Sequence, residues 1–164
     1  TLKRELSRKM EPRTSVPAKR LETLEKLAAA GIPVGVNVAP IIPGLNDEEI
    51  PAILQAAAER GAKTAGRVML RLPYSVKALF DEWLKRVYPE KASRIINRIH
   101  EIRNGELSNA DWGKRFSGEG VYAEHIHDLF RKMCNKYGLN KEHSPTRKDI
   151  FRVPPLDKTQ GELF

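Results

Sequence analysis

Two polar side chains lie on segments that alternate like β-strands, and both residue types are suited to binding a polar ligand. Residues 34–39 alternate valines with small or polar residues, and Asn37 lies on the small face. Its amide offers two donors and an acceptor, either to a ligand or to neighbouring polar groups of the sheet. Residues 66–74 also alternate. The face expected to pack under helices carries Val68, Leu70 and Leu72, and the other face carries Arg67, Met69 and Arg71. An arginine that points into the interior of the fold costs free energy unless its charge is paired. Arg71 is therefore expected to meet a ligand phosphate or carboxylate, or an acidic residue from outside this chain.

Helical patterns separate these two strands. Helices are expected over residues 17–30 and 47–60, each ended by a glycine, whereas residues 1–14 are expected to be irregular. Asn46 and Glu49 have the spacing of a capping box at the start of the second helix. Strands and helices that alternate in this way, with short connections, predict an α/β fold with a parallel sheet.

After residue 75 the pattern is helical only. Ser75 is expected to cap one helix, a second is expected to stop at Gly105, and a third spans about 121–137. Trp112, Arg115 and Phe116 lie in the loop between the last two, where they could stack on a base or anchor the loop in the core. We therefore expect three parts: residues 1–75, a helical extension over 76–138 and a loosely attached tail over 139–164. Two strands are too few for a sheet buried on both faces, so the first part reads as the second half of an α/β domain.

Composition limits the classes of function. The chain has 164 residues and a formal charge of +8, which makes nucleic acid or another polyanion a plausible partner. Pairs at helical spacing, such as Glu22 with Lys26, favour instead a solvated surface. No apolar run is long enough to cross a membrane and no secretory leader opens the chain. Cys134 is the single cysteine, so we expect no internal disulfide and a reducing, cytoplasmic location. The histidine spacing predicts no metal site, and a first residue of Thr1 rather than Met predicts a fragment.

One long stretch carries a family resemblance. Residues 10–47, MEPRTSVPAKRLETLEKLAAAGIPVGVNVAPIIPGLND, resemble the later half of the radical S-adenosylmethionine domain. They are most similar to the DNA-repair-photolyase-like branch, which includes spore photoproduct lyase. The matching pieces, in order, are Glu-Pro-x-Thr-Ser, Ala-Gly-Ile-Pro-Val-Gly and Val-Ala-Pro-Ile-Ile. Downstream, RLPYSVKALFDEWL resembles a subgroup whose members mostly lack an assigned reaction. The resemblance covers about residues 1–138.

The resemblance implies a fold and a chemistry. The fold would be the C-terminal half of a partial (β/α)6 barrel, with the two strands as the fifth and sixth, followed by an all-helical extension. In the family, a 4Fe–4S cluster fed by a reductant protein reduces the sulfonium of S-adenosylmethionine. The resulting 5′-deoxyadenosyl radical abstracts a hydrogen atom from the substrate. The Cys-x-x-x-Cys-x-x-Cys loop that binds the cluster is absent here, and Cys134 alone cannot replace it. The cluster ligands therefore lie outside this chain, which alone is expected to be inactive.

The resemblance also suggests site residues, while the catalytic residues stay unassigned. Thr1 would end the fourth strand and contact the cofactor, and Asn37 would contact its ribose or amino acid moiety. Glu11 and Arg13 follow that strand and would either bind the charged end of the cofactor or pair with each other. Arg71 would contact the substrate, a nucleic acid or other polyanion. The alternative function is a non-catalytic, basic α/β module that binds nucleic acid through its surface.

Overall fold

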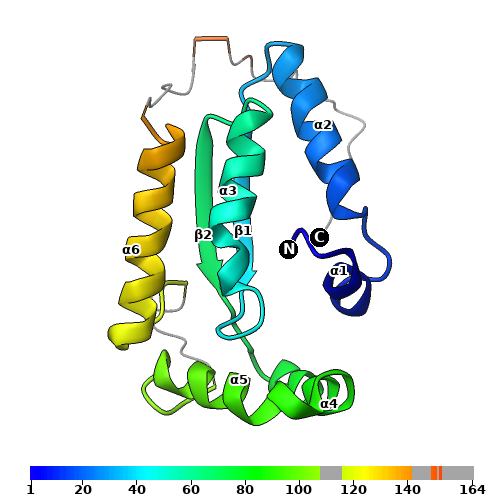
Figure 1. The fold of residues 1–164 in the computed structure, drawn as a ribbon, viewed down its shortest axis with the longest axis vertical. Coiled ribbons are helices and arrows are strands. Elements are labelled where there is room, and N and C mark those ends of the chain that lie inside the picture. Colours follow the sequence, from blue (N-terminus) through cyan, green and yellow to red (C-terminus); the bar gives the residue numbers. More distant parts are fainter. Residues whose placement is uncertain (108–115, 142–148, 151, 153–164) are drawn as a thin grey trace, which may run out of the picture.

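The computed structural model describes residues 1–107, 116–141, 149–150 and 152 (Figure 1). Within these residues the chain is mixed α/β, with six α-helices and two parallel strands. The sequence predicts this class and the parallel pair of strands, but only five of the helices. None of the described helices is long and apolar enough to cross a membrane. The elements are α1 (Arg4–Met10), α2 (Pro17–Ala29), β1 (Gly35–Ile41), the 3₁₀ helix η1 (Asp47–Glu49), α3 (Ile50–Glu59), β2 (Thr64–Met69), α4 (Val76–Val87), α5 (Pro89–Glu101) and α6 (Gly120–Tyr137).

The sheet is covered on one face by a row of helices. Helix α3 connects the parallel strands β1 and β2, and Figure 1 shows α3 in front of the sheet with α6 and α2 on either side of it. Val36 and Val38 point into this layer, where they join a core cluster that includes Ile50, Leu54 and Ile126. Each fully buried aliphatic side chain of this kind contributes about 1.5–3 kcal/mol. The opposite face of β1 is exposed and carries Gly35, Asn37 and Ala39. The alternation predicted for this strand is confirmed.

The predicted sidedness of the second strand is wrong. In the parallel register Arg67 lies opposite Val38, so it faces the helices, with its guanidinium carbon 5.4 Å from the Phe130 ring centroid. Met69 is fully buried in the same layer. Strand β2 ends at Met69, so the alternation over residues 66–74 combined a strand with the loop after it. A parallel partner fixes which residues face the core, and an arginine is tolerated there because its apolar stem packs and its head lies over an aromatic ring.

A second core cluster closes the carboxyl end of the strands. Helices α4 and α5 cross below the strand ends, and α1 lies next to them (Figure 1). Leu6 of α1, Leu70 and Leu72 after β2, and Ile95 of α5 are all buried in this cluster. The prediction that residues 1–14 are irregular was wrong, because a helix held by one buried leucine has no apolar stripe to reveal it.

The predicted helix caps are not formed. The side chain of Asn46 makes no capping hydrogen bond, and Glu49 is buried against the N-terminal segment. Ser75 precedes α4, but its side chain makes no capping bond either.

Of the residues in the loop between α5 and α6, Trp112 and Arg115 lie outside the described part of the chain.

The outer edge of β2 is closed by the segment after α6. The Ala65 N–H donates to Asn140 Oδ1 at 2.8 Å, and Asn140 Nδ2 donates to the Ala65 carbonyl at 2.9 Å. The Asn140 side chain thus replaces a strand at this point. The Met69 N–H donates to the Phe116 carbonyl at 2.9 Å. Leu139 is 2% exposed, so the expected tail is anchored at its first two residues. The outer edge of β1, by contrast, has no strand beside it in the described chain.

Removing the Asn140 amide should loosen this edge. Asn140 has a φ of 60°, a left-handed conformation that glycine also accepts. Asn140→Gly therefore keeps the turn but leaves both polar groups of Ala65 without this partner. We expect the free energy of unfolding to fall by about 1–3 kcal/mol, and the Ala65 amide to exchange hydrogen faster. Asn140→Asp, which keeps one acceptor, should have a smaller effect. Unchanged exchange at Ala65 in Asn140→Gly would contradict the role of this side chain.

Candidate functional site

A cleft of about 130 Å³ lies along the unpaired edge of β1. We call it the edge cleft. Its polar lining comes from Thr1, Arg20, Asn37 and Asn46, and its apolar lining includes Leu2, Leu21, Val36 and Ile53. It shares residues with a more open groove of about 300 Å³ between α2 and the start of β1. A mostly apolar lining with a few polar groups is the usual composition of a ligand site.

The structure brings some of the predicted site residues together. Thr1 and Asn37 both line the edge cleft. Glu11 reaches it only indirectly, through Arg20. Arg13 is exposed outside the cleft, and Arg71 lies beyond the end of β2.

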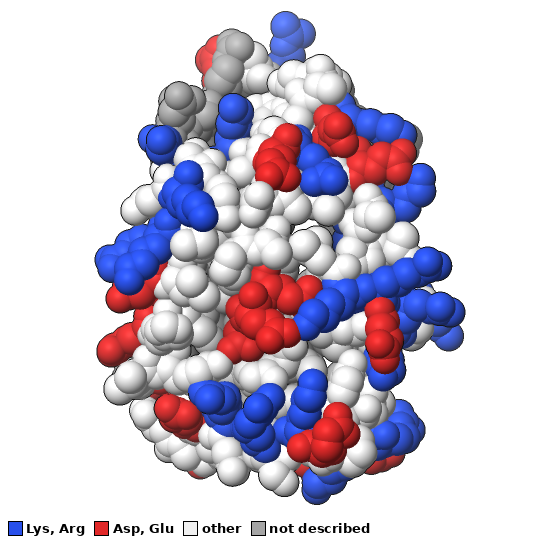
Figure 2. Space-filling model, viewed as in Figure 1, with Lys and Arg blue, Asp and Glu red and all other residues white. Residues whose placement is uncertain are grey.

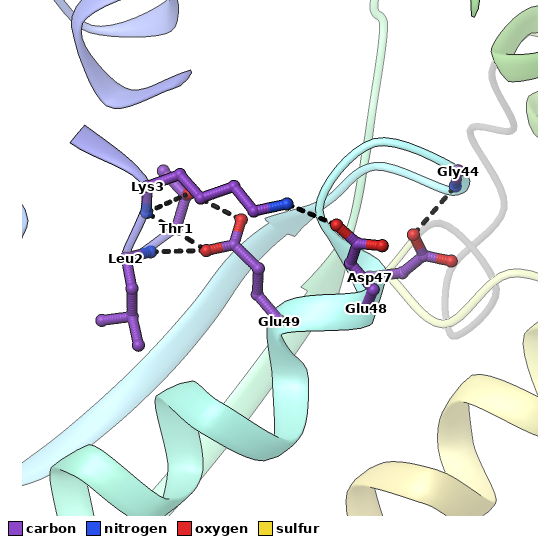
Figure 3. Close-up of polar contacts among 7 residues, drawn as sticks. All are labelled: Thr1, Leu2, Lys3, Gly44, Asp47, Glu48 and Glu49. Atoms are coloured by element: carbon purple, nitrogen blue, oxygen red, sulfur yellow. Dashed lines mark hydrogen bonds and ion pairs between the residues drawn. The ribbon is translucent and has the colours of Figure 1, made fainter. Parts of the chain in front are cut away.

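The carboxylate of Glu49 holds Thr1 at the carboxyl end of β1 (Figure 3). It accepts hydrogen bonds from the Thr1 hydroxyl at 2.6 Å, the Leu2 N–H at 2.8 Å and the Lys3 N–H at 3.2 Å. Lys3 also pairs with Glu48, and the hydrogen bond that its ammonium donates to that carboxylate raises the pKa of Lys3. Glu49 itself is 6% exposed. The N-terminal segment is therefore fixed beside the strand by a buried anion.

Asn46 fixes the loop that follows β1. Its Oδ1 accepts the Ile42 N–H at 2.7 Å, and its Nδ2 donates to the Pro40 carbonyl at 3.0 Å. The capping-box prediction fails because this side chain closes the loop behind it instead of bonding to the helix ahead. The Gly44 N–H donates to Asp47 Oδ1 at 3.0 Å (Figure 3).

The same loop is tied to the helical extension. The Tyr122 hydroxyl of α6 donates to Asp47, and the Arg98 guanidinium carbon of α5 lies 4.1 Å from the Tyr122 ring centroid. Burial, followed by the hydrogen bond to Asp47, raises the pKa of Tyr122 to about 12. Residues from α5 and α6 thus help to position the end of β1.

Glu11 pairs with Arg20, and not with Arg13. Arg20 Nη2 donates to the Glu11 carboxylate and, at 2.7 Å, to the Thr14 hydroxyl, while Nε donates to the Ser15 carbonyl at 2.9 Å. The hydrogen bond from Arg20 lowers the pKa of Glu11. Arg20 thus shapes the turn before α2 and lines the edge cleft. Sequence reasoning missed Arg20 and Glu49, since each acts on residues brought near by the fold, with no local spacing to indicate them.

Two arginines lie close together past the end of β2. The Arg71 guanidinium carbon is 5.0 Å from the Phe116 ring centroid, and its buried Nε has no hydrogen-bond partner in the described chain. Arg103, 2% exposed, donates to the Leu70 carbonyl at 2.7 Å. Burial and then the charge of Arg71 lower the pKa of Arg103. The charge of Glu119 acts in the opposite direction and raises the pKa of Arg103.

Positive and negative side chains alternate over the outer surface. Figure 2 shows blue and red side chains interleaved over this face of the molecule, with red ones grouped over the loop before α3. The described residues contain no group of three His, Cys, Asp or Glu side chains able to hold a metal ion. Cys134 is buried on α6, where burial raises its thiol pKa.

Comparison with known proteins gives one set of relatives. The chain is 37% identical over 163 residues to the uncharacterized protein Rv2578c of Mycobacterium tuberculosis and to the uncharacterized protein Mb2609c of Mycobacterium bovis. The match covers 98% of this chain and 43% of each relative, so the chain spans less than half the length of these proteins. No family model matches the sequence, and no solved structure matches it.

The Tyr122 contact should make stability depend on alkaline pH. The folded-state pKa, about 12, lies above the ordinary tyrosine value of about 10. The stabilisation is therefore complete below pH 10 and is lost as the pH rises from 10 to 12. We expect Tyr122→Phe to lower stability at pH 8 and to flatten the decline between pH 10 and 12, measured by urea unfolding at each pH. A decline as steep in Tyr122→Phe as in the parent would exclude Tyr122 as its source.

Proposed function

We propose that this chain is the C-terminal half of the partial (β/α)6 barrel of a radical S-adenosylmethionine enzyme, followed by its helical extension. The whole protein would be an iron–sulfur enzyme of the DNA-repair-photolyase-like branch that acts on a nucleic acid or other polyanion. The observation that carries the proposal is the difference between the two edges of the sheet. The β2 edge is closed by Asn140, whereas the β1 edge lies open beside a fixed N-terminal segment.

The open edge is suited to a further strand. Parallel sheets normally have several strands and are covered on both faces. Glu49 holds Thr1 at the carboxyl end of β1. Residues that precede Thr1 and run along this edge would form a parallel strand that ends at Thr1. The mycobacterial relatives extend well beyond the matched region, which provides sequence for the other strands.

The open face of β1, beside the edge cleft, has groups that fit S-adenosylmethionine. The Asn37 amide makes no hydrogen bond among the described residues and lies between the small residues Gly35 and Ala39 on the exposed face. Thr1 Oγ1 already donates to Glu49 and accepts from the Lys3 N–H at 3.1 Å, so it offers only one further lone pair. Asn37 would orient the cofactor on the open face of β1, and the apolar wall of the edge cleft would pack against the added strand. When bound, S-adenosylmethionine supplies the hydrogen-abstracting chemistry of the family.

The cluster does not fit this chain. Its binding in the family requires three thiolates, whereas Cys134 is the single cysteine and is buried on α6. Glu11 would act indirectly, by fixing Arg20 at the rim of the cleft, and Arg71 would contact the substrate. Residues upstream of Thr1 would supply the cluster ligands, and a reductant protein would supply the electrons.

The alternative, a non-catalytic nucleic-acid module, is supported by the net charge of +8. A surface that binds nucleic acid normally gathers its cations on one face. Here many are paired with carboxylates, as in Lys19 and Lys26 with Glu22. A Cys-x-x-x-Cys-x-x-Cys motif in the coding sequence before Thr1 would separate the two functions in favour of the enzyme.

Extension of the chain upstream to the length of its relatives should produce an active enzyme. We expect anaerobic reconstitution to give the absorbance of one 4Fe–4S cluster, and a reductant to release 5′-deoxyadenosine from S-adenosylmethionine. The 164-residue chain, treated in the same way, should give neither. A longer protein that binds no cluster, or that binds one without releasing 5′-deoxyadenosine, would refute the proposal.

Asn37 should affect cofactor binding directly. In the extended protein we expect Asn37→Ala to weaken S-adenosylmethionine binding about three- to tenfold, the effect of one or two lost hydrogen bonds, measured by calorimetry. Gly66→Ala should weaken it as well, because a Cβ at Gly66 would lie 3.1 Å from Asn37 Oδ1 and displace the amide. Asn97→Ala, at an exposed position of α5, is the matched control. Equal affinities in Asn37→Ala and Asn97→Ala would rule out this site.

A further inference from the structure

We propose that the carboxyl end of β2 binds single-stranded nucleic acid, with Arg71 contacting a phosphate and Tyr74 stacking on an unpaired base. This inference rests on the proposed function, because it names the substrate class of the same enzyme. It rests on three described features that the fold alone leaves unexplained. These are an unpartnered guanidinium nitrogen, an almost fully exposed aromatic ring and the rigid segment between them.

Arg71 is prepared to bind an anion. Its guanidinium carbon lies 5.0 Å from the Phe116 ring centroid, while its buried Nε has no hydrogen-bond partner in the described chain. A ring over the guanidinium occupies one of its faces and leaves N–H groups at its edge able to bind a phosphate with two parallel bonds. The Nε is shielded from solvent, so a phosphate would bind the terminal Nη groups, for which no hydrogen bond is found in the described chain.

Tyr74 is held out into solvent. Its side chain is 93% exposed, and it has a φ of 47°, which is uncommon for a residue other than glycine. Such backbone conformations persist only where the surrounding structure enforces them, and they concentrate at functional sites. A solvent-exposed aromatic ring beside cationic groups is the usual stacking platform for single-stranded nucleic acid.

The segment between the two residues fixes their spacing. Leu72, 1% exposed, anchors it in the core cluster formed with α4 and α5, and the Pro73 carbonyl accepts the Val76 N–H at 3.0 Å. Three residues of extended chain separate two Cα atoms by at most about 11 Å. Arg71 and Tyr74 are thus close enough to contact one short stretch of a nucleic acid strand.

A single strand fits better than a duplex or a polyanion without bases. Stacking on Tyr74 requires a base whose face is accessible, which a paired duplex does not offer. A simple polyanion would engage Arg71 but would leave the aromatic ring without a role. A protein partner would use the neighbouring exposed side chains Val76 and Leu79 as well.

The test measures binding by fluorescence anisotropy, with the extended protein, a labelled 12-nucleotide oligothymidylate and a duplex of the same length. We expect the single strand to bind more tightly than the duplex. Tyr74→Ala should weaken single-strand binding about tenfold, whereas Tyr74→Phe should preserve it. Tyr74→Asn, which tolerates the left-handed backbone, should behave like Tyr74→Ala if the ring itself is required. Arg71→Ala should reduce the salt dependence by about 0.7 in the log–log slope.

Controls and contrary outcomes are well defined. Val121→Ala, at a 79% exposed apolar position of α6, should bind like the parent. Equal affinity for duplex and single strand, an unchanged affinity in Tyr74→Ala, or full competition by inorganic polyphosphate would overturn the proposal. So would an effect of Leu79→Ala as large as that of Tyr74→Ala, since that would indicate a protein-binding patch. The assay uses neither cluster nor S-adenosylmethionine, so its failure is distinguishable from a lack of 5′-deoxyadenosine formation.

Discussion

A sheet of only two parallel strands is the constraint on which the rest of this structure depends. The edges of such a sheet need hydrogen-bond partners and its faces need a packed layer. This chain supplies partners for one edge and a packed layer for one face. Helices α2, α3 and α6 cover one face, and Asn140 with Phe116 closes the edge of β2. The other face keeps small and polar residues exposed, and the edge of β1 borders a cleft. The two unsatisfied sides meet at Asn37, so the incomplete part of the fold and the candidate site are the same place.

Three consecutive acidic residues each connect the end of β1 to a different part of the chain. Asp47 bonds to Tyr122 and Gly44, Glu48 pairs with Lys3, and Glu49 binds the N-terminal segment. Hydrogen bonds to a carboxylate are worth about 1.5–3 kcal/mol each, but burying the carboxylate costs several kcal/mol. The net gain in stability is therefore small, and the main effect is on position. The helical extension, the strand and the N-terminal segment are fixed relative to one another around a single short loop.

The elements that could be predicted from the sequence are those whose signal is local. The alternation in β1 and the apolar stripes of the longer helices can each be recognised from a short stretch of sequence. The prediction of which β2 residues face the core was wrong. The parallel register of β2 against β1, and not the charge of Arg67, decides this. The capping box failed for a related reason. Asn46 and Glu49 have the spacing of a capping box, yet each side chain forms its hydrogen bonds with residues outside the helix. Asn46 accepts from the Ile42 N–H, and Glu49 accepts from the Thr1 hydroxyl. Arg20 with Glu11 is a contact of the same kind.

The distribution of positive charge bears on the choice between a surface-binding module and an enzyme. Several cations of the outer surface are neutralised by nearby carboxylates, including Lys9, Lys85 and Arg131. Such exposed pairs contribute little to stability, and they also weaken the field that would attract a polyanion. Arg71 differs because it is partly buried just past the end of a strand, lies over the Phe116 ring and has no carboxylate partner in the described chain. In α/β folds ligands bind at the carboxyl ends of the strands, so an unpaired arginine at that end favours recognition within a site over adhesion to a surface.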